Sequence, residues 1–200
     1  MKKTVFILGL IIAPFIAANA QPEHEEFFRK SMKINNTGMI VLGSWAIANM
    51  ATGAVGWAQT TGPTKYFHQM NLFWNMVNLS IAGFALYSNL NTGISSMTGT
   101  EMLDKHTQTE NLYLINAGLD VLYVGAGFYL KHLAAQKPKR HDMFKGYGNS
   151  VILQGSFLFL FDLVMYGIQH SRRMDFAEHL QLSLSPVIGG MQVGLTLPLN

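Results

Sequence analysis

Two aspartates are the residues whose type and spacing most clearly predict chemistry in this sequence. Asp120 and Asp162 each lie near the middle of an apolar run, at residues 111–130 and 150–168, that contains neither Lys nor Arg. Each run is about long enough to cross a bilayer as a helix. In an antiparallel hairpin centred near residue 139 or 140, facing residues have numbers that sum to about 280, and these two sum to 282. We therefore expect both carboxyl groups at the same membrane depth.

A carboxyl group at this depth needs a partner. An Asp at the centre of a spanning helix costs about 2.5–3.5 kcal/mol to insert, so it usually faces the interior of a bundle. We predict that Asp120 and Asp162 face each other or a shared pocket. Two carboxyl groups close together in a low dielectric do not both ionise easily, so we expect at least one to be protonated at neutral pH.

Neutral polar side chains extend this layer at helical spacing. The run at residues 69–90 carries a stripe of amides and small residues: Asn71, Asn75, Asn78, Ala82, Ala85 and Asn89. Amides within a bilayer turn inward and bond across helices. A hairpin centred near residue 63 or 64 would place Asn49 opposite Asn78, at the depth of the aspartates. The predicted polar-layer or binding residues are Asp120, Asp162, Asn49, Asn78, Asn75, Asn116, Gln154 and Tyr123, and no catalytic or metal-binding residue is predicted.

Four membrane-spanning helices, within a domain at residues 36–173, must position these side chains. Gly62-Pro63 marks the first turn, an exposed polar loop of low order is expected at residues 91–110, and a basic loop joins the last two helices. The predicted fold class is an all-α membrane protein, a four-transmembrane-helix antiparallel bundle with a short C-terminal β-hairpin. The expected spans cover residues 37–58, 69–90, 111–130 and 150–168.

The two ends of the chain carry separate signals. Lys2, Lys3, a short apolar core and Ala18-Asn19-Ala20 predict a signal peptide over residues 1–20, with an uncleaved anchor helix as the alternative. A charged surface segment follows at residues 21–35. In the tail at residues 174–200, apolar and polar residues alternate on both sides of a turn, which predicts the β-hairpin. The apolar face of the hairpin could pack on the bundle, or recruit a second copy or a membrane or periplasmic protein by strand addition.

The composition fits one compact membrane domain. Of 200 residues, 49% are hydrophobic and 12% charged, and no cysteine is present, which excludes disulfides and thiolate chemistry. The net charge of +3 arises partly from Lys2 and Lys3. No basic strand with interleaved aromatic residues is present, so nucleic-acid binding is not predicted. Nucleophile-elbow, zinc-protease and phosphate-loop motifs are absent from the sequence. We predict no cofactor, and membrane lipids as general partners.

Four segments carry a recognisable pattern: GMIVLGSWAIAN at residues 38–49, KYFHQMN at residues 65–71 followed by Trp74, Asn75, Val77, Asn78 and Leu79, NAGLD at residues 116–120, and KGYGNS at residues 145–150 with Asp162 downstream. Through these segments the chain resembles an uncharacterised family of small four-helix bacterial membrane proteins, a domain of unknown function. The resemblance covers about residues 36–170. It implies a fold and a location and no catalytic residues.

Three functions follow from these patterns. The first is a non-enzymatic structural or protein-interaction role, in which the polar layer fixes helix register. The alternative is binding or transport of a proton, a cation or a small polar solute through Asp120, Asp162 and the asparagines, because intramembrane acids often lie on such paths. A second alternative is a haem-binding redox protein that uses His68 and His132. The predicted location is the bacterial inner (cytoplasmic) membrane, with several spans and both termini outside the cytoplasm.

Overall fold

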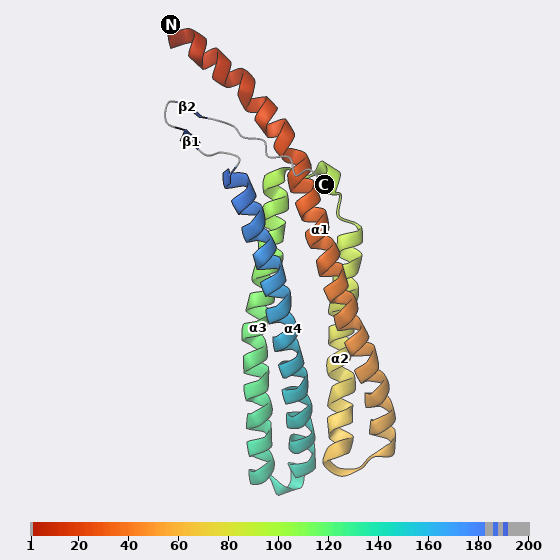
Figure 1. Ribbon diagram of the computed structural model, residues 1–200. Coiled ribbons are helices and arrows are strands. Elements are labelled where there is room, and N and C mark those ends of the chain that lie inside the picture. Colours follow the sequence, from red (N-terminus) through yellow and green to blue (C-terminus); the bar gives the residue numbers. More distant parts are fainter. Residues whose placement is uncertain (1, 183–185, 188–189, 192–200) are drawn as a thin grey trace.

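Four long helices make up almost all of the described chain. The computed structural model describes the backbone of residues 2–182, 186–187 and 190–191, and the side chains of residues 22–179. The all-α bundle predicted from the sequence is confirmed. Short 3-10 helices, η1 Ile94–Ser96 and η2 Pro138–Arg140, lie in two of the connections. The long helices are α1 Lys2–Gln59, α2 Gly62–Leu90, α3 Gly99–Gln136 and α4 His141–Leu182 (Figure 1).

The helices form two antiparallel hairpins. Helix α1 packs along α2 and α3 packs along α4, while contacts between α2 and α4 join the hairpins and α1 makes a smaller contact with α3. Helices α2 and α3 have no comparable backbone contact. We call the end with the α1–α2 and α3–α4 turns the inner end, and the end with the α2–α3 connection the outer end. The first part of α1 projects beyond the outer end (Figure 1).

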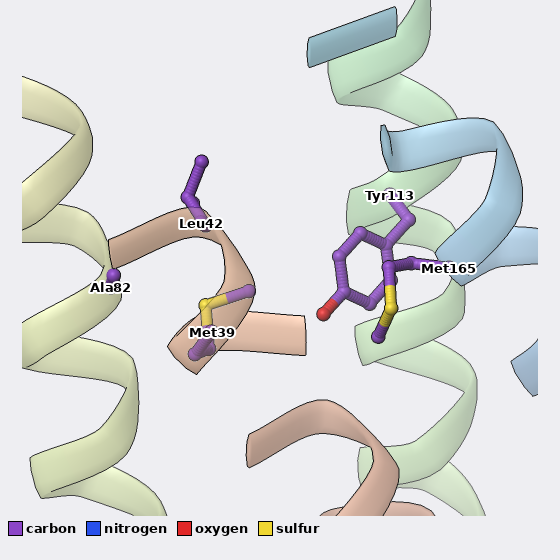
Figure 2. Packing of buried hydrophobic residues seen from close by; sticks show 5 residues of the cluster. All are labelled: Met39, Leu42, Ala82, Tyr113 and Met165. Carbon is purple, nitrogen blue, oxygen red and sulfur yellow. The ribbon is translucent and has the colours of Figure 1, made fainter. Parts of the chain in front are cut away.

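An apolar cluster ties the two hairpins together. Figure 2 shows Met39 and Leu42 of α1 between Ala82 of α2 on one side and Tyr113 of α3 with Met165 of α4 on the other. All five residues are buried. Helix α1 therefore provides the packing surface that all three other helices share.

Three helical segments are long and apolar enough to cross a membrane: residues Pro22–Gln59, Gly99–Gln136 and Pro138–His179. Helix α2 is not among them, because its asparagine stripe lowers its hydropathy. Large apolar side chains such as Phe84, Leu122 and Leu160 point outward, with exposures of 74%, 66% and 63%. An apolar surface of this extent suits contact with acyl chains, so the chain has the features of a membrane protein.

The turn between α1 and α2 is shorter than predicted. Helix α1 ends at Gln59 and α2 begins at Gly62, which has a φ of +60° that favours glycine. Pro63 occupies the first turn of α2, where its missing N–H costs nothing. These features move the centre of the hairpin by about three residues toward the N-terminus. The predicted pairing of Asn49 with Asn78 is wrong, and Asn49 instead bonds with Asn71.

Helix α3 begins earlier than expected. The Oγ1 of Thr98 accepts the N–H of Glu101 at 3.3 Å, and the N–H of Thr98 donates to the Glu101 carboxylate at 2.7 Å. This capping box satisfies two N–H groups at the start of the helix. The predicted loop over residues 91–110 is therefore wrong from residue 99 onward. The outer turns of α3 join the folded bundle.

The predicted C-terminal β-hairpin is also wrong. Helix α4 continues to Leu182, so Leu180 and Leu182, expected to open the first strand, are helical. The two strands, β1 Pro186–Val187 and β2 Gly190–Met191, have only two residues each. Extending an existing helix is easier than forming an isolated hairpin, which is marginal on its own. The residues expected to complete the second strand, 192–200, lie outside the described residues.

Helix α1 runs without a break from Lys2 through the predicted signal peptide into the first apolar run. The signal peptide over residues 1–20 stays a prediction. In the charged segment that follows, Glu25 pairs with Arg29 at 2.6 Å and Glu26 with Lys30 at 2.5 Å. These pairs lie one helical turn apart on an exposed face, as expected for helix-stabilising surface charges.

Candidate functional site

Asp120 of α3 and Asp162 of α4 form a buried carboxyl pair. The two residues are 3% and 6% exposed, and their carboxyl groups lie close enough to interact with each other. A hydrogen bond between two carboxyl groups requires a proton on one of them, because a carboxylate has no hydrogen to donate. The Oδ2 atom of Asp120 is buried and has no hydrogen-bond partner in the part of the chain that the structure describes. The pair thus places two buried carboxyl groups together, and one oxygen of Asp120 receives no hydrogen bond from the described residues.

Glycines allow α3 and α4 to approach closely beside this pair. A Cβ on Gly127 would lie 2.9 Å from the carbonyl oxygen of Gly148, and a Cβ on Gly155 would lie 3.0 Å from Val124 Cγ2. The numbers of these contacting residues sum to 275 and 279, close to the value used in the sequence analysis. Small residues of this kind bring membrane helices into contact, and here they set the register that joins the two acids.

A cavity of about 350 Å³, which we call the central cavity, lies beside the carboxyl pair in the space between α2 and α3. Asn78 of α2 and Asn116 and Tyr123 of α3 contribute to its lining. Asn116 and Tyr123 are exposed, so the cavity reaches the molecular surface. At its inner end, the rings of Trp74 and Tyr123 meet edge to face, with centroids 4.9 Å apart.

A second polar region, the amide network, connects α1, α2 and α4. It consists of Trp45, Asn49, Asn71, Asn75 and Gln154. The indole N–H of Trp45 donates to Gln154 Oε1 at 3.0 Å, and the amide of Gln154 donates to Asn71 Oδ1. The amide of Asn71 donates to Asn49 Oδ1 at 3.0 Å. Asn75 and Gln154 are fully buried, and every buried amide in the network has a partner.

The eight predicted residues divide between these two regions. Asn78 connects them, because its amide donates to Asn75 Oδ1 at 3.3 Å and its side chain lines the central cavity. The sequence predicted one continuous layer, whereas the structure separates a hydrogen-bonded part from a part that faces open space. The amide network contains Asn49, Asn75 and Gln154, and the central cavity is lined by Asp120, Asp162, Asn116 and Tyr123.

A third polar region, the outer cluster, was not found from the sequence. It joins Glu110 of α3 to His170 and Arg173 of α4: the Nε of Arg173 donates to Glu110 Oε2 at 2.7 Å, and His170 Nδ1 lies 2.6 Å from Glu110 Oε1. Burial alone would raise the pKa of Glu110, but the hydrogen bonds from Arg173 and His170 outweigh it and hold the pKa below its usual value. Nearby, burial lowers the pKa of His106, whose Nε2 lies 3.1 Å from the carbonyl oxygen of Gln169.

The outer cluster was missed because residues 91–110 were assigned to a loop. Glu110 and His170 have numbers that sum to 280, so the hairpin rule that paired the aspartates also pairs these two residues. The capping motif Thr98-Gly99-Thr100-Glu101 would have placed Glu110 on a helix and made that comparison possible.

The two histidines of the haem hypothesis have separate surroundings. His68 packs against Gly56 of α1, where an added Cβ would lie 2.3 Å from the imidazole ring. His132 is exposed and lies 2.9 Å from the amide nitrogen of Gln136 on its own helix. This arrangement gives no support to a haem held between them.

Comparisons with known proteins identify a family. A family model described as a family of unknown function (DUF6992) matches residues 41–163. No curated protein and no solved structure matches the chain. The matched range includes the amide network and both acids of the carboxyl pair, while His170 and Arg173 of the outer cluster follow it. Because the match covers more than half of the sequence, this chain belongs to the family of unknown function DUF6992.

Proposed function

We propose that the protein is a multi-pass membrane protein that binds a small organic cation at the Asp120–Asp162 pair, in competition with protons. The observation that supports this most is the buried Asp120 oxygen without a partner, beside a central cavity of about 350 Å³. A buried acceptor left unsatisfied costs about 1–3 kcal/mol. A ligand that offsets its charge or donates to it would remove that cost.

The charge of the central cavity favours a cation. Among the described residues that line it are two acids and no Lys, Arg or His. With one proton shared, the pair carries a single negative charge. Inside a membrane protein such a charge attracts a counter-ion much more strongly than it would in water.

The walls favour an organic cation over a hydrated metal ion. Trp74, Tyr113, Tyr123 and Phe161 line the central cavity, together with aliphatic side chains. An ammonium group over an aromatic face gains about 0.5–2 kcal/mol. The volume is near the lower end of the range of about 300–1,000 Å³ for small-molecule sites. We therefore propose an ammonium ion with apolar substituents as the ligand class.

The test uses benzyltrimethylammonium as the probe and the full chain in lipid nanodiscs. Binding should be saturable by calorimetry and should weaken as the pH falls, because protonation of both acids removes the negative charge. Neopentylbenzene has the same shape with a carbon in place of the charged nitrogen. Equal binding of both compounds, or no binding of the cation, would contradict the proposal.

Matched variants locate the site. Asp120→Asn and Asp162→Asn should each weaken probe binding about 30-fold or more, because each removes one of the two carboxyl groups over which the negative charge of the site is shared. Asp104→Asn is the control, since Asp104 is exposed on α3 and does not line the central cavity. An equal effect of the control would assign the binding to general surface charge.

A structural or protein-interaction role is the second candidate, and the amide network supports it. A closed set of hydrogen bonds fixes helix register without a ligand. Under this candidate, the variant with both Asp120→Asn and Asp162→Asn folds and performs normally in cells, whereas under the proposed function it folds but is inactive. A complementation assay with a deletion strain separates the two.

The proposed location is the bacterial inner membrane, with both ends of the mature chain outside the cytoplasm. The predicted signal peptide supports this orientation, whereas the Lys and Arg residues are divided equally between the two ends and do not decide it. Membrane lipids are the proposed general partners. Fusions of a reporter active only outside the cytoplasm should be active at residue 97 and inactive at residue 138.

A further inference from the structure

A second cavity, the outer cavity, lies between the helices at the outer end and has a volume of about 210 Å³. Its lining is largely polar and includes Ser31 and Asn35 of α1, Asn89 of α2, His106 of α3 and Gln169 of α4. These residues come from all four helices. The outer cavity is therefore a product of the bundle and not of a single loop.

Two buried oxygens suggest what the outer cavity holds. Ser31 Oγ and Gln169 Oε1 have no hydrogen-bond partner among the described residues, and both residues line the cavity. Ser31 and Gln169 are 3% and 1% exposed. A molecule of liquid water occupies about 30 Å³, and polar cavities of sufficient size are usually hydrated. Several water molecules fit here and would satisfy both oxygens.

A hydrogen bond between α3 and α1 lies between the outer and central cavities. Tyr113 lines the central cavity, Asn35 lines the outer cavity, and the hydroxyl of Tyr113 donates to Asn35 Oδ1. Tyr113 and Asp162 line the same central cavity. Tyr113 and Asn35 therefore lie between the outer cavity and the cavity that contains the carboxyl pair.

Packing contacts lie on the inner side of the carboxyl pair. Trp74 and Tyr123 meet across the space between α2 and α3. The close contacts of Gly127 with Gly148 bring α3 against α4, and the amide network fills the space among α1, α2 and α4. Among the described residues, the polar outer cavity thus lies on one side of the acids and aromatic and glycine packing lies on the other.

We propose that protons reach the Asp120–Asp162 pair from water in the outer cavity, past a gate formed by Tyr113 and Asn35. This inference rests on the proposed function, in which the pair exchanges a proton with the cation. On protonation, a hydronium ion in the outer cavity transfers its proton to a carboxylate oxygen and becomes water, and release reverses the step. Lys105 and His106 are the titratable groups that line this cavity, and the nearby outer cluster adds Glu110, His170 and Arg173.

The test blocks the outer cavity reversibly. Thr109 lines the outer cavity on α3, and the natural chain has no cysteine. In Thr109→Cys, reaction with a small charged methanethiosulfonate reagent should slow proton exchange at the pair about tenfold or more, as followed by rapid-mixing infrared spectroscopy. Reduction of the adduct should restore the rate. The matched control is Thr107→Cys, on the same helix and outside the residues that line the outer cavity, and its rate should not change.

A second variant tests the gate itself. Tyr113→Phe removes the hydrogen bond to Asn35 while keeping the ring, and should speed proton exchange several-fold. An unchanged rate in both modified Thr109→Cys and Tyr113→Phe would overturn the proposed route. Failure of the proposed function gives a different result, since the unmodified protein would then show no exchangeable protonated carboxyl. Equilibrium binding of benzyltrimethylammonium to Thr109→Cys and Thr107→Cys, neither of which lines the central cavity, checks that the cavity is intact in those two variants.

Discussion

The amide network and the carboxyl pair are both buried polar regions of one bundle, but they differ in their partners. In the amide network, Gln154 bonds to side chains of both α1 and α2. The buried amides of the network form hydrogen bonds with one another. In the carboxyl pair, Asp120 and Asp162 interact with each other, and one oxygen of Asp120 has no hydrogen-bond partner among the described residues. The hydrogen bonds of the amide network are therefore used within the fold, whereas the carboxyl pair keeps an oxygen that a ligand could contact.

Both regions are buried, so burial does not distinguish them. The difference in hydrogen bonding separates polar groups that stabilise the fold from polar groups that remain available to a ligand. Both regions meet the same criterion in the sequence, a polar residue within an apolar run. The free space next to the Asp pair is the distinguishing feature, and it arises because α2 and α3 have no backbone contact comparable to the contacts within each hairpin. The variants below are designed to test this division.

The largest stability effect is expected in the amide network. Gln154→Leu leaves Trp45 and Asn71 without their partner and should lower the free energy of unfolding by about 2 kcal/mol, since interhelical bonds contribute about 0.6 kcal/mol each and stranded groups add a desolvation cost. Unfolding in nanodiscs by steric trapping measures the change. The control is Ser156→Leu, at an exposed position of α4. A change in the free energy of unfolding no larger than that of the control would show that the amide network does not stabilise the fold.

The outer cluster should behave like the amide network, with a smaller effect and a pH dependence. Because the pKa of Glu110 is below its usual value in the folded chain, ionised Glu110 stabilises the fold above its unfolded-state pKa. That stabilisation is lost as the pH falls through the folded-state pKa. Glu110→Gln should cost about 1 kcal/mol at neutral pH and should flatten the acid side of the stability curve. An acid dependence identical to that of the natural chain would assign the effect to other carboxyl groups.

The carboxyl pair should contribute less to stability than either of these regions. Replacing both acids by asparagine should change the free energy of unfolding by less than about 1 kcal/mol, because removing both members of a buried pair leaves no unpaired charge. The same protein should no longer bind benzyltrimethylammonium. A loss of several kcal/mol in the free energy of unfolding would show that the carboxyl pair stabilises the fold as the amide network does.

The smallest effect is expected at Asn116. This side chain lines the mouth of the central cavity, is exposed and makes no hydrogen bond within the described residues. Asn116→Ala should change stability by less than about 0.5 kcal/mol and probe affinity by about twofold. A large loss of affinity in the calorimetric assay would extend the binding site to the rim of the cavity.

Helical periodicity predicted the four helices and the pairing of α3 with α4, because a short basic loop fixes the register of adjacent antiparallel helices. It also predicted the inward direction of Asn71, Asn75, Asn78 and Ala82, which are buried on α2. The register of α1 against α2 was missed because Pro63 was read as part of a long loop, whereas proline is well accepted in the first turn of a helix.

Other features depended on information that periodicity does not contain. The alternating leucines after residue 179 suit a strand, but the preceding helix extends through Leu182 once it has formed. The division of the polar layer depends on which helices diverge, and no residue of α2 or α3 signals that gap. The position of Glu110 on a helix opposite His170 could have been predicted from the capping motif at Thr98 and the same hairpin rule that paired the aspartates.

The central claim, a carboxyl pair that shares one proton beside an open cavity, is tested most directly by infrared spectroscopy of the purified chain at pH 7. The claim predicts a carbonyl band from one protonated carboxyl group, absent in Asp120→Asn with Asp162→Asn and shifted when benzyltrimethylammonium binds. Two fully ionised carboxylates, or a band that the probe does not alter, would contradict it.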